Sequence, residues 1–189
     1  YKAMNQEYTL SVFSEDHIGI LNQITIILTR RQINIDSITA SESAVKGVHL
    51  ITIVVRTTPE LVHKVVRQME KVIDVLKVFA HTSEEIVYQE IALFKVSTKV
   101  MMSGNIVDQV VRNHNGRLVE TTPEYMVIEK TGHKDEIIEL LHFLEKHGIL
   151  QFVRSGRVAI TRQVKELNSY LKEMDSATRS KITESGIYN

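Results

Sequence analysis

The chain has 189 residues, with 23 basic side chains (Lys plus Arg), 23 acidic side chains (Asp plus Glu) and no cysteine. The lack of cysteine excludes disulfides, thiolate metal sites and a cysteine nucleophile, and the zero net charge argues against a main role in binding nucleic acid or a membrane surface. No apolar run reaches the roughly 18 residues that cross a bilayer, so we expect a soluble, cytoplasmic protein of one large or two small domains.

The first part of the chain predicts four strands and two helices. Polar and apolar side chains alternate at its start, as in a half-buried strand, and apolar positions then recur at three- and four-residue steps, as in a helix. Asp16 stands where the N-cap of that helix is expected, and Thr58 and Pro59 are typical of the start of a second helix. The predicted bounds are 8–13 (strand), 18–31 (helix), 33–40 and 49–56 (strands), 59–73 (helix) and 74–81 (strand).

The same order of elements returns about 80 residues later, with little sequence identity between the two copies. The predicted bounds are 90–98 (strand), 103–113 (helix), 117–122 and 125–131 (strands), 133–146 (helix) and 149–154 (strand), with 157–162 as a further strand that closes the unit. We therefore predict an α+β protein of two ferredoxin-like βαββαβ domains. Each is expected to be an antiparallel sheet covered by two helices.

The junction between the two copies is polar. We expect the first domain at 7–82, a linker at 82–85 and the second domain at 86–174. Apolar side chains at helical spacing predict a final amphipathic helix at 163–174. Residues 175–189 are polar and lack a core pattern, so we expect them to form a disordered tail.

The sequence contains no recognisable catalytic constellation. Glu15, Asp16 and His17 are consecutive polar residues, a pattern that is more typical of capping than of catalysis. The eight histidines lack the spacing of metal ligands, and no phosphate-binding loop or nucleophile elbow is present. RNA recognition is disfavoured as well, because the expected inner strands lack the aromatic side chains on which bases stack. We therefore expect neither catalysis nor a metal site.

Two residues favour a small-molecule site instead. Gly19 is expected in the first turn of the first helix, where glycine costs about 1 kcal/mol relative to alanine and where open backbone amides attract a carboxylate or phosphate. The alternative is a glycine tolerated near a frayed helix end. Asn34 opens the next strand, and its amide suits both the ammonium and the carboxylate of an amino acid, although asparagine is equally typical of a turn.

The run SEDHIGILNQITIILTRRQINIDSIT (14–39) resembles the opening motif of ACT domains, which sense amino acids. More narrowly, residues 8–173 resemble the small regulatory subunits of acetohydroxyacid synthase (acetolactate synthase). Residues 19–21 and 30–38 stand where that family has its first two motifs. Three later segments continue the resemblance, namely VIDVLKV (72–78), EIALFKV (90–96) and VRSG (153–156).

The resemblance implies a non-catalytic regulatory subunit whose N-terminal ACT domains form a homodimer. It implies that valine or another branched-chain amino acid binds between the two chains and causes feedback inhibition. It also implies a catalytic partner subunit that carries thiamine diphosphate, Mg and FAD, whereas this chain carries no cofactor. Amides around Gly19 are then expected to bind the effector carboxylate, and Asn34 of the facing chain its polar end. The implied effector-binding residues are Asp16, His17, Ile18, Gly19, Ile20, Asn34 and Ile35.

Two positions depart from the family pattern. Asp16 stands where the family often has asparagine, and its carboxylate is expected to repel the effector carboxylate unless it pairs with the effector ammonium. Gln32 replaces a common glycine and changes the strain of the turn before the strand. The alternative function is a free-standing ACT-domain amino-acid sensor that regulates a different enzyme or a transcription factor.

Overall fold

The computed structural model describes residues 5–163, together with Lys172 and Ser176. The chain divides into two compact units, one holding the residues up to Val87 and again those from Ala159, and the other being Tyr88–Val158. Apart from Gln163, Lys172 and Ser176, the helix expected at 163–174 and the tail expected at 175–189 lie outside the described residues.

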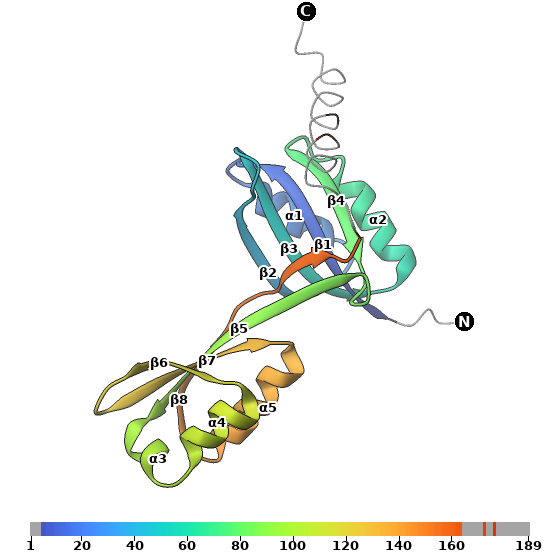
Figure 1. Cartoon of the computed structure of the whole chain (residues 1–189). Coiled ribbons are helices and arrows are strands. Elements are labelled where there is room, and N and C mark those ends of the chain that lie inside the picture. Colours follow the sequence, from blue (N-terminus) through green and yellow to red (C-terminus); the bar gives the residue numbers. More distant parts are fainter. Residues whose placement is uncertain (1–4, 164–171, 173–175, 177–189) are drawn as a thin grey trace, which may run out of the picture. The chain divides into compact units, whose positions relative to one another are not determined.

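The first unit is a four-stranded antiparallel sheet with two helices on one face (Figure 1). The strand order is β2-β3-β1-β4, so the first and third strands of the chain are central and β2 and β4 are the edges. The elements are β1 (Gln6–Glu15), α1 (Ile20–Thr29), β2 (Ile35–Glu42), β3 (Val48–Thr57), α2 (Pro59–Met69) and β4 (Val75–His81).

Both faces of this sheet carry apolar side chains. The face beneath α1 and α2 holds the main core, which includes the fully buried Leu10, Ile24 and Val65. These residues come from alternate strand positions and from one face of each helix, as the periods of strand and helix require. The opposite face holds a second, smaller cluster that includes Phe13 and Leu76.

The two helices of the first unit begin in different ways. The α2 helix begins as predicted, because the Leu61 amide donates to the Thr58 hydroxyl at 3.3 Å and Pro59 occupies the first helical position. The prediction that Asp16 caps α1 is wrong. Gly19 is the N-cap, with left-handed backbone angles (φ 92°, ψ −6°), and no side chain caps the helix. The chain turns sharply into the helix at this residue, and only glycine adopts that conformation without strain.

The second unit is built around a sheet with the strand order β6-β7-β5-β8, and β9 also pairs with β5. Its main core includes the fully buried Phe94, Ile128 and Leu140 beneath the helices. The elements are β5 (Ile86–Ser97), α3 (Thr98–Met102), α4 (Ile106–His114), β6 (Arg117–Thr121), β7 (Tyr125–Gly132), α5 (Lys134–Glu145), β8 (Ile149–Arg154) and β9 (Val158–Thr161). Two antiparallel sheets flanked by helices confirm the predicted α+β class.

Two features of the second half differ from the predicted plan. Thr98, expected as the last residue of a strand, instead begins the short helix α3, which buries Met101 in the core. The strand expected to close the second domain is β9, but its residues from Ala159 onward group with the first unit. The division between the two compact units falls after Val87, inside β5. No helix in the described part of the chain is long and apolar enough to cross a membrane.

Candidate functional site

The loop that joins β1 to α1 leads into a helix start without a side-chain cap, where the Ile20 amide donates to the His17 oxygen at 3.2 Å. Gly19 has a positive φ of 92°, and a Cβ added there would meet no atom within 4 Å, so the space beside the loop is free. The α1 helix has neither a side-chain cap nor an acidic residue in its first turn. Uncapped N–H groups at a helix start carry partial positive charge and bind anions such as carboxylates.

The same loop is held in place by two other elements of the first unit. The His17 imidazole Nδ1 lies 3.1 Å from the Asp74 carboxylate, in the connection between α2 and β4. The Glu15 amide donates to the backbone oxygen of Asp74 at 2.8 Å, so Asp74 contacts the loop twice. The Asp16 carboxylate lies 3.7 Å from the Nε2 atom of His49, at the start of β3. Sequence reasoning did not identify Asp74 and His49, since only the fold brings them to the loop.

The two isoleucines of the loop have opposite environments. The Ile20 side chain is buried in the main core and anchors the first turn of α1. The Ile18 side chain is fully exposed. A large apolar side chain beside an open helix start is available to contact the apolar part of a ligand or a second chain.

The remaining candidate residues lie at the other end of the sheet. Asn34 is exposed directly before β2, and Ile35 is half-buried against the main core. Ile35 pairs with Val55, and Val55 pairs with Tyr8, which is at the opposite end of β1 from the loop. Tyr8 and Glu15 are seven residue steps apart along β1, a distance of about 23 Å at 3.3 Å per residue. Within a single chain, Asn34 and the Gly19 loop therefore lie at opposite ends of the sheet.

The turn before Asn34 is strained. Gln32 adopts a left-handed conformation with φ 55°, which is unfavourable for a residue with a side chain. Its amide donates to the Thr29 oxygen at 2.9 Å, and the Ile33 amide donates to the Leu28 oxygen at 3.1 Å. These bonds end α1 and hold the turn that leads into β2.

The described residues offer no reaction centre at these positions. Within that part of the chain, no group of three or more His, Asp or Glu side chains is placed to hold a metal ion. What the site combines is an open helix start, an exposed apolar side chain and two histidine–carboxylate contacts. This arrangement suits binding of a small zwitterion better than bond chemistry.

The fold of the first unit is that of an ACT-type domain. Family models agree with this class. The AHAS small subunit-like ACT domain matches residues 10–77, and the small subunit of acetolactate synthase matches residues 89–163.

Whole-chain relatives extend the match. The acetolactate synthase small subunit of Mycolicibacterium smegmatis is 31% identical over 155 residues, covering 82% of this chain and 91% of the relative. That of Bacillus subtilis is 34% identical over 164 residues, covering 84% and 91%. The crystal structure of the small subunit from Thermotoga maritima has a TM-score of 0.76 at 25% identity, covering 85% of this chain and 99% of that one.

The chain belongs to the family of acetolactate synthase small subunits. Members of this family are regulatory subunits of a thiamine-diphosphate-dependent enzyme in branched-chain amino-acid biosynthesis, so this chain is not itself catalytic. The match extends over both units, which favours this function over a free-standing ACT-domain sensor.

Proposed function

We propose that the chain senses a branched-chain amino acid, valine foremost, at the start of α1 and passes this signal to the catalytic subunit of acetohydroxyacid synthase. The observation that carries the proposal is the uncapped α1 helix, which begins at a left-handed Gly19 with free space beside it. The first amides bind the carboxylate of the amino acid. The exposed Ile18 contacts its apolar side chain.

A homodimer through the ACT domains completes this site. β2 is an edge strand, and in a two-fold pairing of β2 with its copy the two strands run antiparallel. The Asn34 end of one strand then lies beside the Glu42 end of the other. Glu42 pairs with His49, and Val48 pairs with Glu15, which leads into the Gly19 loop. The geometry of the sheet thus supports a site that takes Asn34 and Ile35 from one chain and the loop from its partner.

Asp16 is compatible with an effector carboxylate at this site. Its own carboxylate lies 3.7 Å from the Nε2 atom of His49, and a contact with the effector ammonium offsets the negative charge of Asp16. The His17 imidazole is turned to Asp74 and positions the loop. We therefore assign Asp16 to tuning effector affinity, and His17 to holding the loop.

The catalytic subunit supplies the chemistry. In keeping with the family, we propose that this partner carries thiamine diphosphate, Mg and FAD, and that the two subunits meet in the cytoplasm. Valine binding favours one packing of the ACT dimer, and the catalytic subunit responds to that packing. The coupling free energy required between the two sites is about 1–3 kcal/mol.

The test is an activity assay of the catalytic subunit from the same source, with and without this chain, across a valine titration. We expect activation by the chain and inhibition by valine. Asn34→Ala should remove the valine inhibition and keep the activation, whereas Asn105→Ala, an exposed residue of the second unit, should change neither. Valine inhibition that survives Asn34→Ala would refute the proposed site, and a chain that never activates the enzyme would refute the proposed partner.

A further inference from the structure

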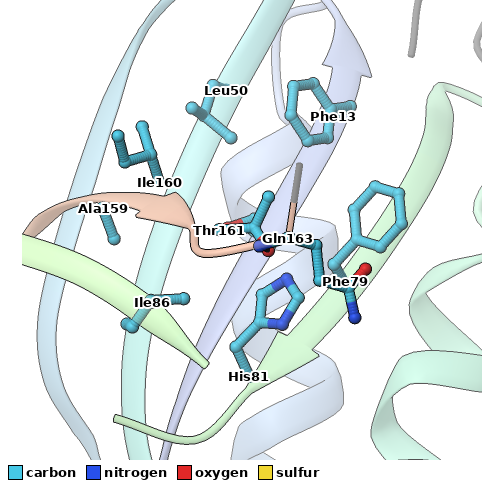
Figure 2. A pocket seen from close by; sticks show the side chains of 10 residues that line it. Phe13, Leu50, Phe79, His81, Ile86, Ala159, Ile160, Thr161 and Gln163 are labelled. Atoms are coloured by element: carbon cyan, nitrogen blue, oxygen red, sulfur yellow. Dashed lines mark hydrogen bonds between the residues drawn. The ribbon is translucent and has the colours of Figure 1, made fainter. Parts of the chain in front are cut away.

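A cavity of about 360 Å³ lies in the first unit, on the sheet face that α1 and α2 leave uncovered (Figure 2). Its walls come from β1, β3 and β4 of the sheet, from the start of β5 and from β9 with the residues that follow it. The Gly19 loop leads to α1 on the other face, so the cavity is separate from the proposed effector site. A volume of this size is typical of small-molecule sites.

The sheet wall of the cavity is apolar and aromatic. Phe13 and Leu50 face each other across β1 and β3, and Phe79 meets the Phe13 ring edge-on at a centroid distance of 6.1 Å. The open face of a two-layer sheet usually carries polar side chains, because water covers it. Exposure to water therefore does not account for the apolar side chains that line the cavity on this face.

The strand β9 crosses this face without filling it. The Arg162 amide donates to the Glu85 oxygen at 2.8 Å, which ties the end of β9 to the start of β5. Ile160 lines the cavity and yet remains 69% exposed. Figure 2 shows Ala159 and Ile160 on the strand that runs across β1 and β3. β9 therefore covers this face of the sheet, and the cavity beneath it has room for an apolar ligand.

Polar side chains in the cavity wall determine which kind of ligand can bind there. Ser11, His81 and Gln163 contribute a hydroxyl, an imidazole and an amide, which between them both donate and accept hydrogen bonds. None of the ten lining residues is a Lys, Arg, Asp or Glu. The wall therefore offers no basic side chain to pair with an anion, and the cavity favours a neutral ligand.

We propose that this cavity is a second ligand site of the chain. Its ligand is a small, uncharged molecule with an aromatic or branched apolar body and one amide- or alcohol-like group. The apolar body lies against Phe13, Leu50 and Phe79, and the polar group bonds to His81 or Gln163. Because β9 forms part of the wall, the ligand also holds β9 on the first unit.

The test uses the full chain and the probe pair benzamide and benzoate, which have the same shape and differ in charge. In ¹H–¹⁵N correlation spectra we expect benzamide to shift the amide signals of cavity residues in a saturable way. Benzoate should bind about tenfold more weakly at neutral pH, because its charge must be desolvated against a wall that holds no Lys or Arg side chain to pair with it. Equal or tighter binding of benzoate would overturn the ligand class, and no saturable benzamide shift would overturn the site.

A variant pair within β9 locates the probe. Ala159→Phe adds a ring at a wall position and should abolish benzamide binding, whereas Val158→Phe, one residue earlier and outside the wall, should preserve it. Gln163→Ala leaves the strand intact and should weaken binding about threefold to tenfold through the loss of one hydrogen bond. Benzamide binding that survives both Ala159→Phe and Gln163→Ala, or shifts that centre on Gly19, would overturn the assignment. Neither valine nor the catalytic subunit is used, so this outcome is independent of the proposed function.

Discussion

Replacing Gly19 by alanine, and comparing the result with a matched glycine control, tests backbone strain and ligand binding separately. The residue has φ 92°, and the added Cβ meets no atom within 4 Å, so the whole cost comes from the left-handed backbone. That cost is about 1–2 kcal/mol. For a chain of this length it corresponds to a fall in Tm of about 2–8 °C.

The chain offers a matched control for this substitution. Gly47, in the turn between β2 and β3, has φ 79° and likewise has no atom within 4 Å of an added Cβ. Gly47→Ala should therefore lower Tm by a similar amount. Only Gly19→Ala places a methyl group, or a shifted amide, where the effector carboxylate is proposed to bind.

Thermal unfolding followed by circular dichroism measures the loss of stability, and calorimetric titration with valine measures the change in affinity. We expect both variants to unfold at lower temperature. We expect the valine Kd to rise about tenfold or more for Gly19→Ala, equivalent to about 1.4 kcal/mol, and to stay unchanged for Gly47→Ala. An unchanged Tm for Gly19→Ala would refute the strain argument, and equal valine Kd values in both variants would refute the binding argument.

Three further predictions test other parts of the fold. Gln32→Gly should relieve the left-handed strain at φ 55° and stabilise the chain by about 0.5–1 kcal/mol, so an unchanged or lower urea midpoint would contradict that account. Glu85→Gln should lower Tm at pH 7. Because the Thr82 amide depresses the folded pKa of Glu85, the ionised carboxylate stabilises the folded chain above its ordinary pKa of 4.5, and the Tm difference should shrink as the pH falls below that value. Phe94→Ala should cost about 3–5 kcal/mol in the fully buried core of the second unit, while Leu93→Ala, a 43% exposed neighbour, should cost under about 1 kcal/mol by urea denaturation.

The types of most elements and the family could be predicted from the amino-acid sequence alone. Apolar side chains repeat at the period of a helix or a strand, and this local pattern reports which face of an element is buried. The start of α2 was also predicted, because Thr58 and Pro59 cap and begin the helix within one turn of the chain. The motif around Gly19 and the segments after it carried the resemblance to acetolactate synthase small subunits across both units.

The start of the α1 helix and the contacts that hold its loop depend on long-range packing, which the sequence pattern does not encode. Asp16 has the side chain of an N-cap, but the chain turns at Gly19, and the carboxylate lies beside His49 instead. The contact of Asp74 with His17 joins residues far apart in the sequence. No local pattern encodes such a contact, since it depends on the register of β1 against its neighbouring strands.

The position of β9 likewise depends on long-range packing. Its sequence predicts a strand and says nothing about the partner, and the strand pairs with β5 while its residues from Ala159 group with the first unit. Pairing depends on which edge and which apolar surface remain free after the rest of the chain has folded. The cavity beneath β9 therefore depends on the tertiary structure, whereas the Gly19 loop was already singled out from the sequence.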